Sequence, residues 1–318
     1  MTSTAGPERF GAIDLGTHTC CLAIAELEGE GMRLLYRERA APRLGEGLAH
    51  RDRLDPAAAE RTLAVLDRFA RLLRDHRVSR GRFLATEACR RARDGRAFLS
   101  RVRERTGLAF ELIPPAEEAR LAMLSVLPLL GPGFERTLLV DVGGGSIELA
   151  LVRSRGRTAD AQPFRVVSLR VGVVLLSELP GSDQEQLLEA ELGRIPAALR
   201  SGGDLGLEVI VVSNTLLECA RRLRQAGSGG VECSDHLCLE GADLEASTAA
   251  LSASPQPWHG CRADGCARRL SAGLRVLRAL VLGLRPARLV VADRGLHDGQ
   301  LVAFSRCARQ MPRAGSGS

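Results

Sequence analysis

Lysine is absent from this chain of 318 residues, so all 44 of its basic residues are arginine. The absence excludes the P-loop nucleotide enzymes, because the phosphate loop of that class requires a lysine. Much of the arginine reflects overall composition, since alanine, glycine and leucine are frequent alongside it. Arginine can also bind two phosphate oxygens at once, and the formal net charge of +6 suits an anionic ligand.

Aromatic residues are scarce as well, at 3% of the chain, so the core must be built mainly from aliphatic side chains. Proteins that bind single-stranded nucleic acid usually stack bases on aromatic rings, and few rings exist here. No basic helix motif or dense arginine block indicates DNA binding. We therefore expect no nucleic-acid partner.

Long apolar runs are missing too. No stretch of 18 apolar residues occurs, and four arginines interrupt the leucine-rich segment 274–291. No charged start followed by an apolar stretch precedes Phe10, so no secretory signal is expected. These absences predict a soluble, cytoplasmic protein with no membrane contact, in which the nine cysteines are reduced thiols.

One segment is crowded with thiols and imidazoles but contains no Cys-x-x-Cys pair, and its spacing matches no common zinc pattern. We expect buried small residues and loop thiols there rather than a metal site. The residues concerned are Cys233, His236, Cys238, His259, Cys261 and Cys266.

The order of predicted elements occurs twice along the chain, which indicates an internal duplication. Each half opens with a strand, a turn containing Asp-x-Gly, and a second strand; the turns are Asp14-Leu15-Gly16 and Asp141-Val142-Gly143. Two strand-turn-helix units follow in each half. They end near Thr86 and Glu118 in the first half, and near Thr215 and Asp293 in the second.

The duplication predicts an α/β protein of two related lobes, with matching turns on opposite walls of a cleft. We expect residues 1–126 to form the first lobe, 127–310 the second, and 311–318 a disordered tail. Within the first lobe, Asp55 and Pro56 predict the start of a helix. Two prolines at 114–115 are expected to break a strand, with a helix starting at Glu117.

The two Asp-x-Gly turns suit phosphate. Glycine lets the backbone come close to a phosphate, and the N–H groups of the turn can donate to its oxygens. Hydroxyl groups at Thr17, Thr19 and Ser146 add donors. Asp14 and Asp141 can only accept, so a divalent cation held through water is the ligand we expect for them. Glu148, on the same strand face as Ser146, is a further cation ligand or a holder of water.

Two interpretations of the pair Glu117-Glu118 remain open from the residues alone. Acidic residues are common at the start of a helix, where they suit the positive end of the dipole. One of them could instead face the cleft as a general base for an attacking water. Arg90, early in its own helix, could place a positive charge opposite that carboxylate.

These segments, in this order and spacing, resemble the exopolyphosphatase/guanosine pentaphosphate phosphatase family over nearly the whole chain, in its short, two-domain form. The family shares a two-lobed, ribonuclease H-like fold with actin and the sugar kinases. The segments are Ala12-Ile13-Asp14-Leu15-Gly16-Thr17, Arg43-Leu44-Gly45-Glu46-Gly47-Leu48, Ala85-Thr86-Glu87-Ala88-Cys89-Arg90, Glu117-Glu118-Ala119-Arg120-Leu121, Val140-Asp141-Val142-Gly143-Gly144-Gly145-Ser146-Ile147-Glu148-Leu149 and Asp293-Arg294-Gly295-Leu296.

The resemblance implies a role for each motif residue. Glu118, the second Glu of its motif, matches the catalytic base, and a homodimer using Mg²⁺ is implied. The metal-linked acids match Asp14, Asp141 and Glu148. The phosphate-binding positions match Gly16, Thr17, His18, Thr19, Arg90, Gly143, Gly144, Gly145, Ser146, Asn214 and Thr215.

Four departures from the family pattern imply altered substrate size or weakened catalysis. His18 stands where the first turn usually has Asn, and Pro115-Ala116 replaces Ser-Gly before the Glu pair. Ile147 replaces the Thr of the second turn. A Gly-containing turn becomes Ser213-Asn214-Thr215, the mildest change because Asn tolerates a left-handed backbone.

Three functional hypotheses follow. The first is a magnesium-dependent phosphohydrolase acting on inorganic polyphosphate or guanosine pentaphosphate. The second, suggested by the altered loops, is a regulator that binds polyphosphate or guanosine tetraphosphate and pentaphosphate with little or no hydrolysis. The third is an ATP-using enzyme like the sugar kinases, and it is the weakest because no sugar-binding signature is present.

Overall fold

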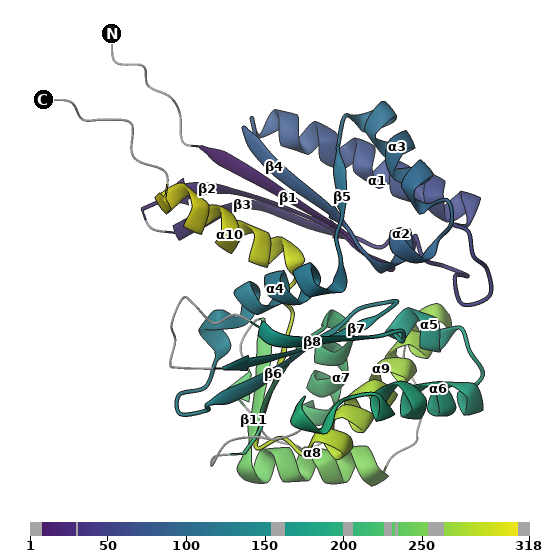
Figure 1. The fold of residues 1–318 in the computed structure, drawn as a ribbon, viewed down its shortest axis with the longest axis vertical. Helices are drawn as coiled ribbons and strands as arrows, with labels where there is room; N and C mark the ends of the chain where they lie inside the picture. The colour runs from purple at the N-terminus through teal and green to yellow at the C-terminus, as the bar shows by residue number, and fades with distance from the viewer. Residues whose placement is uncertain are drawn as a thin grey trace, which may run out of the picture.

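The computed structural model describes residues 8–29, 31–153, 163–199, 206–225, 231–232, 235–253 and 264–310. Two lobes, each built on one β-sheet, lie one above the other in Figure 1. The predicted tail 311–318, and three members of the thiol-rich segment (Cys233, His259 and Cys261), lie outside the described residues. Within the described ranges, no helix is both long and apolar enough to cross a bilayer.

The sheet of the first lobe has the order β3-β2-β1-β4-β5. Strand β1 pairs antiparallel with β2 and parallel with β4. The elements of this half of the chain are β1 (Arg9–Leu15), β2 (Cys20–Glu28), β3 (Gly31–Ala40), α1 (Pro56–Asp75), β4 (Arg80–Ala85), α2 (Glu87–Arg91), α3 (Gly95–Thr106), β5 (Phe110–Leu112), α4 (Pro115–Val126) and the 3₁₀ turn η1 (Leu127–Leu129).

The sheet of the second lobe has the order β10-β11-β12-β9-β6-β7-β8. Its elements are β6 (Arg136–Val142), β7 (Ile147–Arg153), β8 (Pro163–Leu169), α5 (Val173–Ser177), α6 (Gly181–Gly193), η2 (Ala197–Leu199), β9 (Glu208–Val212), α7 (Asn214–Gln225), β10 (Val231–Glu232), β11 (His236–Glu240), α8 (Gly241–Ala253), α9 (Asp264–Leu284), β12 (Arg288–Ala292) and α10 (Leu296–Gln310).

The predicted duplication is confirmed by the two sheets. The segment β8-β7-β6-β9-β12 of the second sheet repeats the order β3-β2-β1-β4-β5 of the first. Strand directions repeat as well, because β6 pairs antiparallel with β7 and parallel with β9. Strands β11 and β10 extend the second sheet beyond β12, and β11 runs antiparallel to it.

Local signals in the sequence explain where two helices start. The Asp55 side chain accepts a hydrogen bond of 3.0 Å from the Ala58 N–H and caps α1, whose first residue is Pro56, as predicted. The prediction for α4 was wrong by two residues, because the helix starts at Pro115 and not at Glu117. Proline is well suited to the first helical position, where no backbone N–H is needed, so Pro115 begins this helix.

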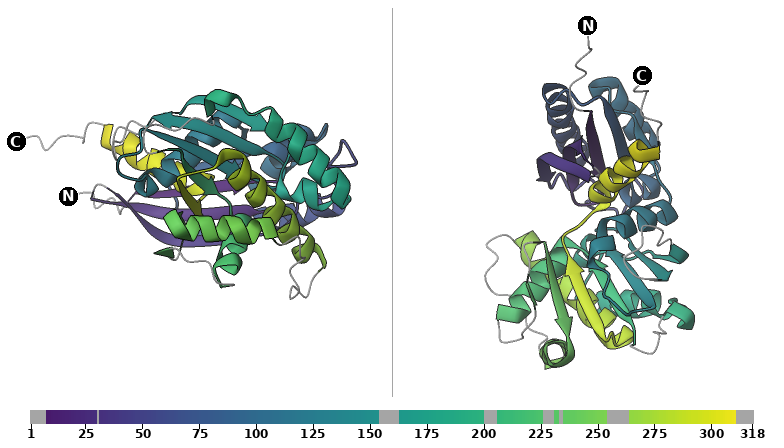
Figure 2. Two further views of the ribbon diagram at one scale, coloured as in Figure 1. Left: turned by 90° about the horizontal axis from the view of Figure 1, so that it is seen from below. Right: turned by 90° about the vertical axis from the view of Figure 1, so that its left-hand side faces the viewer.

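Helices α4 and α10 each cover the sheet of the other half of the chain. Leu121 of α4 shares an apolar cluster with Leu139 and Ile210 of the second sheet, whereas Phe304 of α10 packs on Phe10 of β1 with ring centroids 5.1 Å apart. Figure 2 shows α10, in yellow, rising from the second lobe to the first. The predicted lobes, 1–126 and 127–310, divide the chain in sequence order. The packing differs at two helices, because α4 lies against the second sheet and α10 against the first.

The two crossing helices touch at a glycine. A Cβ atom placed on Gly299 of α10 would lie 2.0 Å from the carbonyl oxygen of Leu121 in α4. Only a residue without a side chain permits so close an approach. The two lobes are therefore joined where these helices cross, next to the turn 293–295 that leads into α10.

Candidate active site

The two predicted glycine turns have the same backbone hydrogen bond. Gly16 N–H donates to the carbonyl oxygen of Thr19 over 2.9 Å, and Gly143 N–H donates to that of Ser146 over 3.0 Å. Each turn joins the first two strands of its lobe, so the duplication places them at equivalent positions. The structure thus brings both predicted phosphate turns to the same edge of their sheets.

The carbonyl oxygens of the two turns accept hydrogen bonds from backbone N–H groups of other segments, whereas several N–H groups of the turns have no acceptor. The carbonyls of residues 17–18 and 143–144 accept hydrogen bonds of 2.9 to 3.1 Å from the N–H groups of residues 43, 45, 173 and 174. The N–H groups of Thr17, His18, Gly144 and Gly145 have no acceptor in the part of the chain that is described. Successive free N–H groups of this kind form a binding site for anions.

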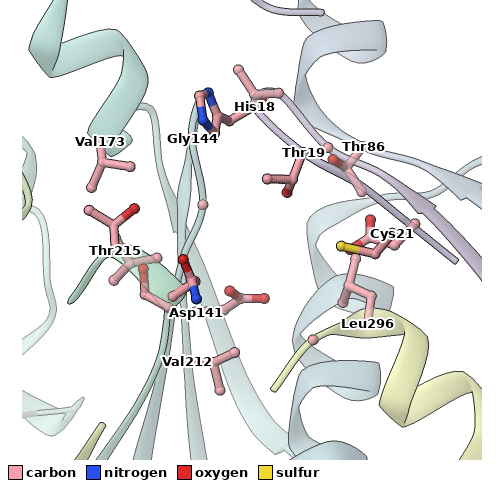
Figure 3. A pocket seen from close by; sticks show the side chains of 18 of the residues that line it. His18, Thr19, Cys21, Thr86, Asp141, Gly144, Val173, Val212, Thr215 and Leu296 are labelled. Atoms are coloured by element: carbon pink, nitrogen blue, oxygen red, sulfur yellow. The ribbon is translucent and has the colours of Figure 1, made fainter. Parts of the chain in front are cut away.

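The two turns also touch across the boundary between the lobes. A Cβ atom on Gly145 would lie 2.8 Å from Thr17 Oγ1, and one on Gly144 would lie 3.1 Å from Thr17 Cβ. Figure 3 shows His18 of the first lobe next to Gly144 of the second. Glycine at these two positions lets the two turns approach each other this closely.

Below the turns lies a pocket of about 340 Å³ lined by both lobes. Every predicted site residue except Arg90 lines it. These residues are Asp14, Gly16, Thr17, His18, Thr19, Glu118, Asp141, Gly143, Gly144, Gly145, Ser146, Glu148, Asn214 and Thr215.

Strand register explains which side chains reach the pocket from the sheets. Residues directly opposite one another on paired strands lie on the same face. Asp14 of β1 is opposite Cys21 of β2, which is opposite Arg39 of β3. This set of three is called the first row.

The duplication produces an equivalent second row in the other lobe. Asp141 of β6 is opposite Glu148 of β7, which is opposite Ser168 of β8. The Ser168 hydroxyl donates a hydrogen bond of 2.9 Å to Glu148 Oε1. The two rows meet at one pocket but differ in charge, because the second row has two acids where the first has one acid and one arginine.

Burial strongly perturbs the acids of this pocket. Burial and the nearby Glu118 raise the pKa of Asp14 to about 7. Burial, followed by repulsion from neighbouring carboxylates, raises the pKa values of Asp141 and Glu148 well above their ordinary range. Because so many acids share a buried site, some of these carboxyl groups stay protonated and neutral unless a cation balances their charge.

The donor set fits a hard cation such as Mg²⁺, which prefers oxygen ligands. Asp14 Oδ1 is buried and has no hydrogen-bond partner, so it has an unused lone pair for a cation or its water. Within the described residues, no three carboxylate, imidazole or thiol groups come close enough to ligate one ion together. Mg²⁺ usually keeps several waters and is also held by substrate phosphates, so it needs few direct protein ligands.

The structure separates the roles of the two neighbouring glutamates on α4. Glu117 pairs with Arg82 at 2.9 Å and Arg120 at 2.7 Å outside the pocket, and the hydrogen bond from Arg120 lowers its pKa. Glu118 lines the pocket and is 4% exposed. Burial raises the pKa of Glu118 to about 7, although Arg90 opposes the shift. A carboxyl group with a pKa near 7 can exchange protons at neutral pH.

Arg90 lies behind Glu118 and does not line the main pocket. Its guanidinium forms an ion pair with Glu118, pairs with Glu87 at 3.0 Å, and donates to the carbonyl of Ile113 over 2.6 Å. These contacts fix the direction of the Glu118 carboxylate. The predicted contact of Arg90 with phosphate would require the guanidinium to exchange one of these partners.

Several residues that line the pocket were not predicted as site residues, and they come from both lobes. Arg39 reaches across the cleft to Asp293 with two hydrogen bonds of 2.6 and 3.1 Å, and Asn214 also donates to Asp293 over 3.2 Å. The alternation of β3 could have shown that Arg39 shares a face with Arg37, but its position next to Asp14 depends on register. The other lining residues that were not predicted include Glu87, Arg269 and His297, whereas Thr86 and Asp293 mark turns that the duplication predicted to face the cleft.

His18 contacts one of the missed residues. Arg269 NH1 lies 2.8 Å from His18 Nε2, and because arginine can only donate, Nε2 accepts. Burial, then Arg269 and Arg43, lowers the pKa of His18 to about 4. At neutral pH the ring is therefore uncharged and carries its proton on Nδ1.

Two of the four departures from the family pattern do not change the residues that line the pocket. Ile147 is fully buried in the core of the second lobe, facing away from the pocket. Pro115 begins α4 without lining the pocket. His18 and Asn214 are the departures that do change the pocket.

Fold and site together define a two-lobed α/β protein in which duplicated glycine turns and buried acids face one cleft. The chain belongs to the Ppx/GppA phosphatase family, whose model matches residues 23–201. Exopolyphosphatase 2 of Mycobacterium tuberculosis is 35% identical over 153 residues, 45% of this chain and 48% of that protein. The guanosine-5'-triphosphate,3'-diphosphate pyrophosphatase of Photobacterium profundum is 27% identical over 224 residues, 68% of this chain and 44% of that protein.

The chain spans about half the length of these curated relatives. Solved structures share its fold over nearly its whole length. The Ppx/GppA family member from Aquifex aeolicus has a TM-score of 0.71 and 24% identity, covering 96% of this chain and all of that one. An exopolyphosphatase from Cytophaga hutchinsonii has a TM-score of 0.77 and 19% identity, covering 94% and 98%. The predicted two-lobed fold is thereby confirmed.

Proposed function

We propose that the protein hydrolyses the terminal phosphoanhydride bond of inorganic polyphosphate or guanosine pentaphosphate in this cleft. The observation that carries the proposal is Glu118, a buried carboxyl group with a pKa near 7 that lines a pocket between two anion-binding turns. Membership of the Ppx/GppA phosphatase family supports it. So do the names of the two curated relatives, one an exopolyphosphatase and the other a guanosine nucleotide pyrophosphatase.

In the proposed reaction, the free N–H groups of both turns bind the oxygens of the terminal phosphate. Glu118 accepts a proton from a water molecule, and the oxygen of that water forms a bond to the terminal phosphorus. The bond between this phosphorus and the bridging oxygen breaks, which releases inorganic phosphate and a substrate shorter by one phosphate. Phosphoryl transfer depends mostly on such positioning and on charge stabilisation.

Asp14, Asp141 and Glu148 would hold the proposed Mg²⁺ largely through water, and the ion would screen the negative charge of the phosphates. We assign Arg90 to positioning Glu118, because it binds that carboxylate directly. Glu87 in turn holds Arg90. The homodimer implied by the resemblance remains a prediction, and light scattering would test it by measuring the mass of the protein in solution.

The test is phosphate release from long-chain polyphosphate and from guanosine pentaphosphate, with and without Mg²⁺. Glu118→Gln should lower the rate by about 10²- to 10⁴-fold, the usual contribution of a general base. Glu117→Gln is the matched control, and it should keep most of the activity because Glu117 pairs outside the pocket. Equal losses in both variants would contradict the assignment of Glu118.

A second candidate is a regulator that binds the same anions without hydrolysing them. The observation that favours it is His18, since the resemblance implies Asn there and the ring now contacts Arg269 inside the pocket. This hypothesis predicts tight binding of polyphosphate or guanosine tetraphosphate by the wild-type protein without release of phosphate. Magnesium-dependent release that is lost in Glu118→Gln would exclude it.

A further inference from the structure

A pocket of about 370 Å³ lies beside Arg90 in the first lobe and shares no lining residue with the main cleft. It is formed where α2 and the start of α3 meet the end of β5, three elements that lie together in Figure 1. Its volume is within the range of about 300–1,000 Å³ that is usual for sites of small molecules. We call it the back pocket.

The charged side chains that line the back pocket are Arg90, Arg93 and Arg96, and no acid of the described residues lines it. Arg96 is exposed and has no ion-pair partner among the residues that the structure covers. Arg93 pairs through Nε with Asp52 at 2.8 Å, and both side chains are largely exposed, so water weakens this pair. An anion in the back pocket would therefore find guanidinium groups that are available to bind it.

Arg90 connects the back pocket to the carboxylate that we propose as the base. Its hydrogen bonds to Glu87, to the carbonyl oxygen of Ile113 and to Glu118 use four of its five N–H groups. The fifth, on Nη2, has no acceptor in the described part of the chain. One guanidinium group thus lines the back pocket while it also holds Glu118, which lines the main cleft.

The start of α3 adds positive character at the same place. Asp94 is at the N-cap position, but its side chain accepts a hydrogen bond of 3.0 Å from Leu54 N–H and does not cap the helix. The backbone N–H groups of Arg96 and Ala97 in the first turn have no acceptor within the described residues. Free N–H groups at the start of a helix favour a nearby anion, so the backbone supports the three arginines.

The rest of the back pocket is an apolar wall. Cys89 and Ala92 come from α2 and the residue after it, and Leu112, Ile113 and Pro114 come from the end of β5 and the residues that follow. A flat ring can pack on such a wall, and a guanidinium group can stack on the face of the ring. The chemistry of the back pocket therefore fits a ligand in which a phosphate group is joined to an aromatic ring.

Building on the function proposed above, we propose that the back pocket binds a nucleoside phosphate, with its phosphate group on Arg93, Arg96 and the free N–H of Arg90 and its base against the apolar wall. A phosphate group bound to Arg90 shares the positive charge that holds Glu118, so the ion pair between Arg90 and Glu118 weakens. The Glu118 carboxylate is then less firmly directed towards the water that it deprotonates. The ligand therefore slows phosphate release from a site outside the main cleft.

Calorimetric titration with AMP tests the binding, because AMP has no phosphoanhydride bond that the main cleft could hydrolyse. The double variant Arg93→Gln/Arg96→Gln should weaken the binding of AMP by about tenfold or more, since it removes two charged hydrogen-bond donors. Inorganic phosphate and adenosine should each bind the wild-type protein much more weakly than AMP, because each meets only one half of the back pocket. The matched control is Arg71→Gln/Arg103→Gln, which removes the same charge from exposed positions on α1 and α3 outside both pockets and should leave the affinity for AMP unchanged.

No binding of AMP by the wild-type protein, equal losses in the two double variants, or inorganic phosphate that binds as tightly as AMP would overturn the proposal. Rates of phosphate release from polyphosphate test the effect on Glu118. AMP should lower kcat of the wild-type protein with little change in KM, and a rise in KM alone would place AMP in the main cleft and contradict the proposal. Calorimetry requires no turnover, so a wild-type protein that releases no phosphate would refute the proposed hydrolysis, while the binding of AMP still decides whether the back pocket is a site.

Discussion

The two lobes have the same sheet order and the same hydrogen-bonded turn, yet their rows carry different side chains. In the first row, Asp14 is followed by Cys21 and Arg39. In the second row, the position equivalent to Cys21 holds the buried acid Glu148. The duplicated backbone thus supplies two equivalent turns with free N–H groups, whereas the side chains make only the second row rich in acids.

A second pair of equivalent acids differs in its surroundings. Glu118 follows β5, and Asp293 follows β12, the strand at the same place in the second sheet. Burial alone would raise the pKa of Asp293, but hydrogen bonds from Arg39 and Asn214 lower it. Burial raises the pKa of Glu118 to about 7. One acid is thereby kept charged as a structural contact, and the other can act as a base.

The largest effect expected from this comparison concerns the two rows. Glu148→Gln should raise the Mg²⁺ concentration needed for half-maximal phosphate release by about 10- to 100-fold, the usual range for residues that orient a metal's ligands. Cys21→Ala changes the equivalent position of the first lobe and should alter the Mg²⁺ requirement little. Magnesium titrations of the two variants check this. A similar change in the Mg²⁺ requirement of both variants would contradict the inference that the cation is held mainly by the second row.

A smaller effect is expected where the lobes are joined. Gly299→Ala places a methyl group against the backbone of α4, so the crossing helices must separate, and overpacking of this kind costs about 1–3 kcal/mol. Gly283→Ala is the control, because a Cβ there meets nothing within 4 Å, and alanine should stabilise α9 by up to about 1 kcal/mol. Thermal unfolding of both variants tests the crossing, and equal melting temperatures would contradict it.

The sequence predicted the motifs of the site well because they are local. Each glycine turn, with its Asp and its hydroxyl group, lies within a few residues, and the lining of one pocket by Glu118 and both turns confirms that these motifs converge. The crossing of α4 and α10 was not predicted. Which sheet a helix covers depends on tertiary packing, and a short amphipathic pattern shows only that one face is buried.

Arg39 and His297 were missed for the same reason. Arg39 belongs to a largely exposed strand, and only the register with Cys21 places it beside Asp14. His297 is 2% exposed and lines the pocket because α10 returns to the first lobe. Neither residue carries a local sequence signal that points to phosphate chemistry.

The smallest effect is expected at the ion pair between the lobes. The side chains of Arg39 and Asp293 are 34% and 30% exposed, so Asp293→Asn should lower stability by no more than about 1 kcal/mol. It should nonetheless change the KM for polyphosphate, because it frees Arg39 within the cleft. Arg194→Ala removes an exposed pair inside the second lobe and should leave the KM unchanged. Identical KM values for the two variants would contradict a role of the Arg39 contact in the cleft.

The pH dependence of kcat/KM for polyphosphate tests most directly whether Glu118 is the base. A base works when it is deprotonated, and the pKa of Glu118 is raised to about 7. Activity should therefore fall about tenfold for each pH unit below pH 7 and level off above it. Titration of the substrate persists in Glu118→Gln. Asp14, whose pKa is also raised to about 7, persists there too, so both profiles are recorded at saturating Mg²⁺, which would keep Asp14 charged, and the comparison then isolates Glu118. We predict that the variant loses this inflection; an unchanged inflection in the variant, or a flat profile in the wild type, would contradict the assignment.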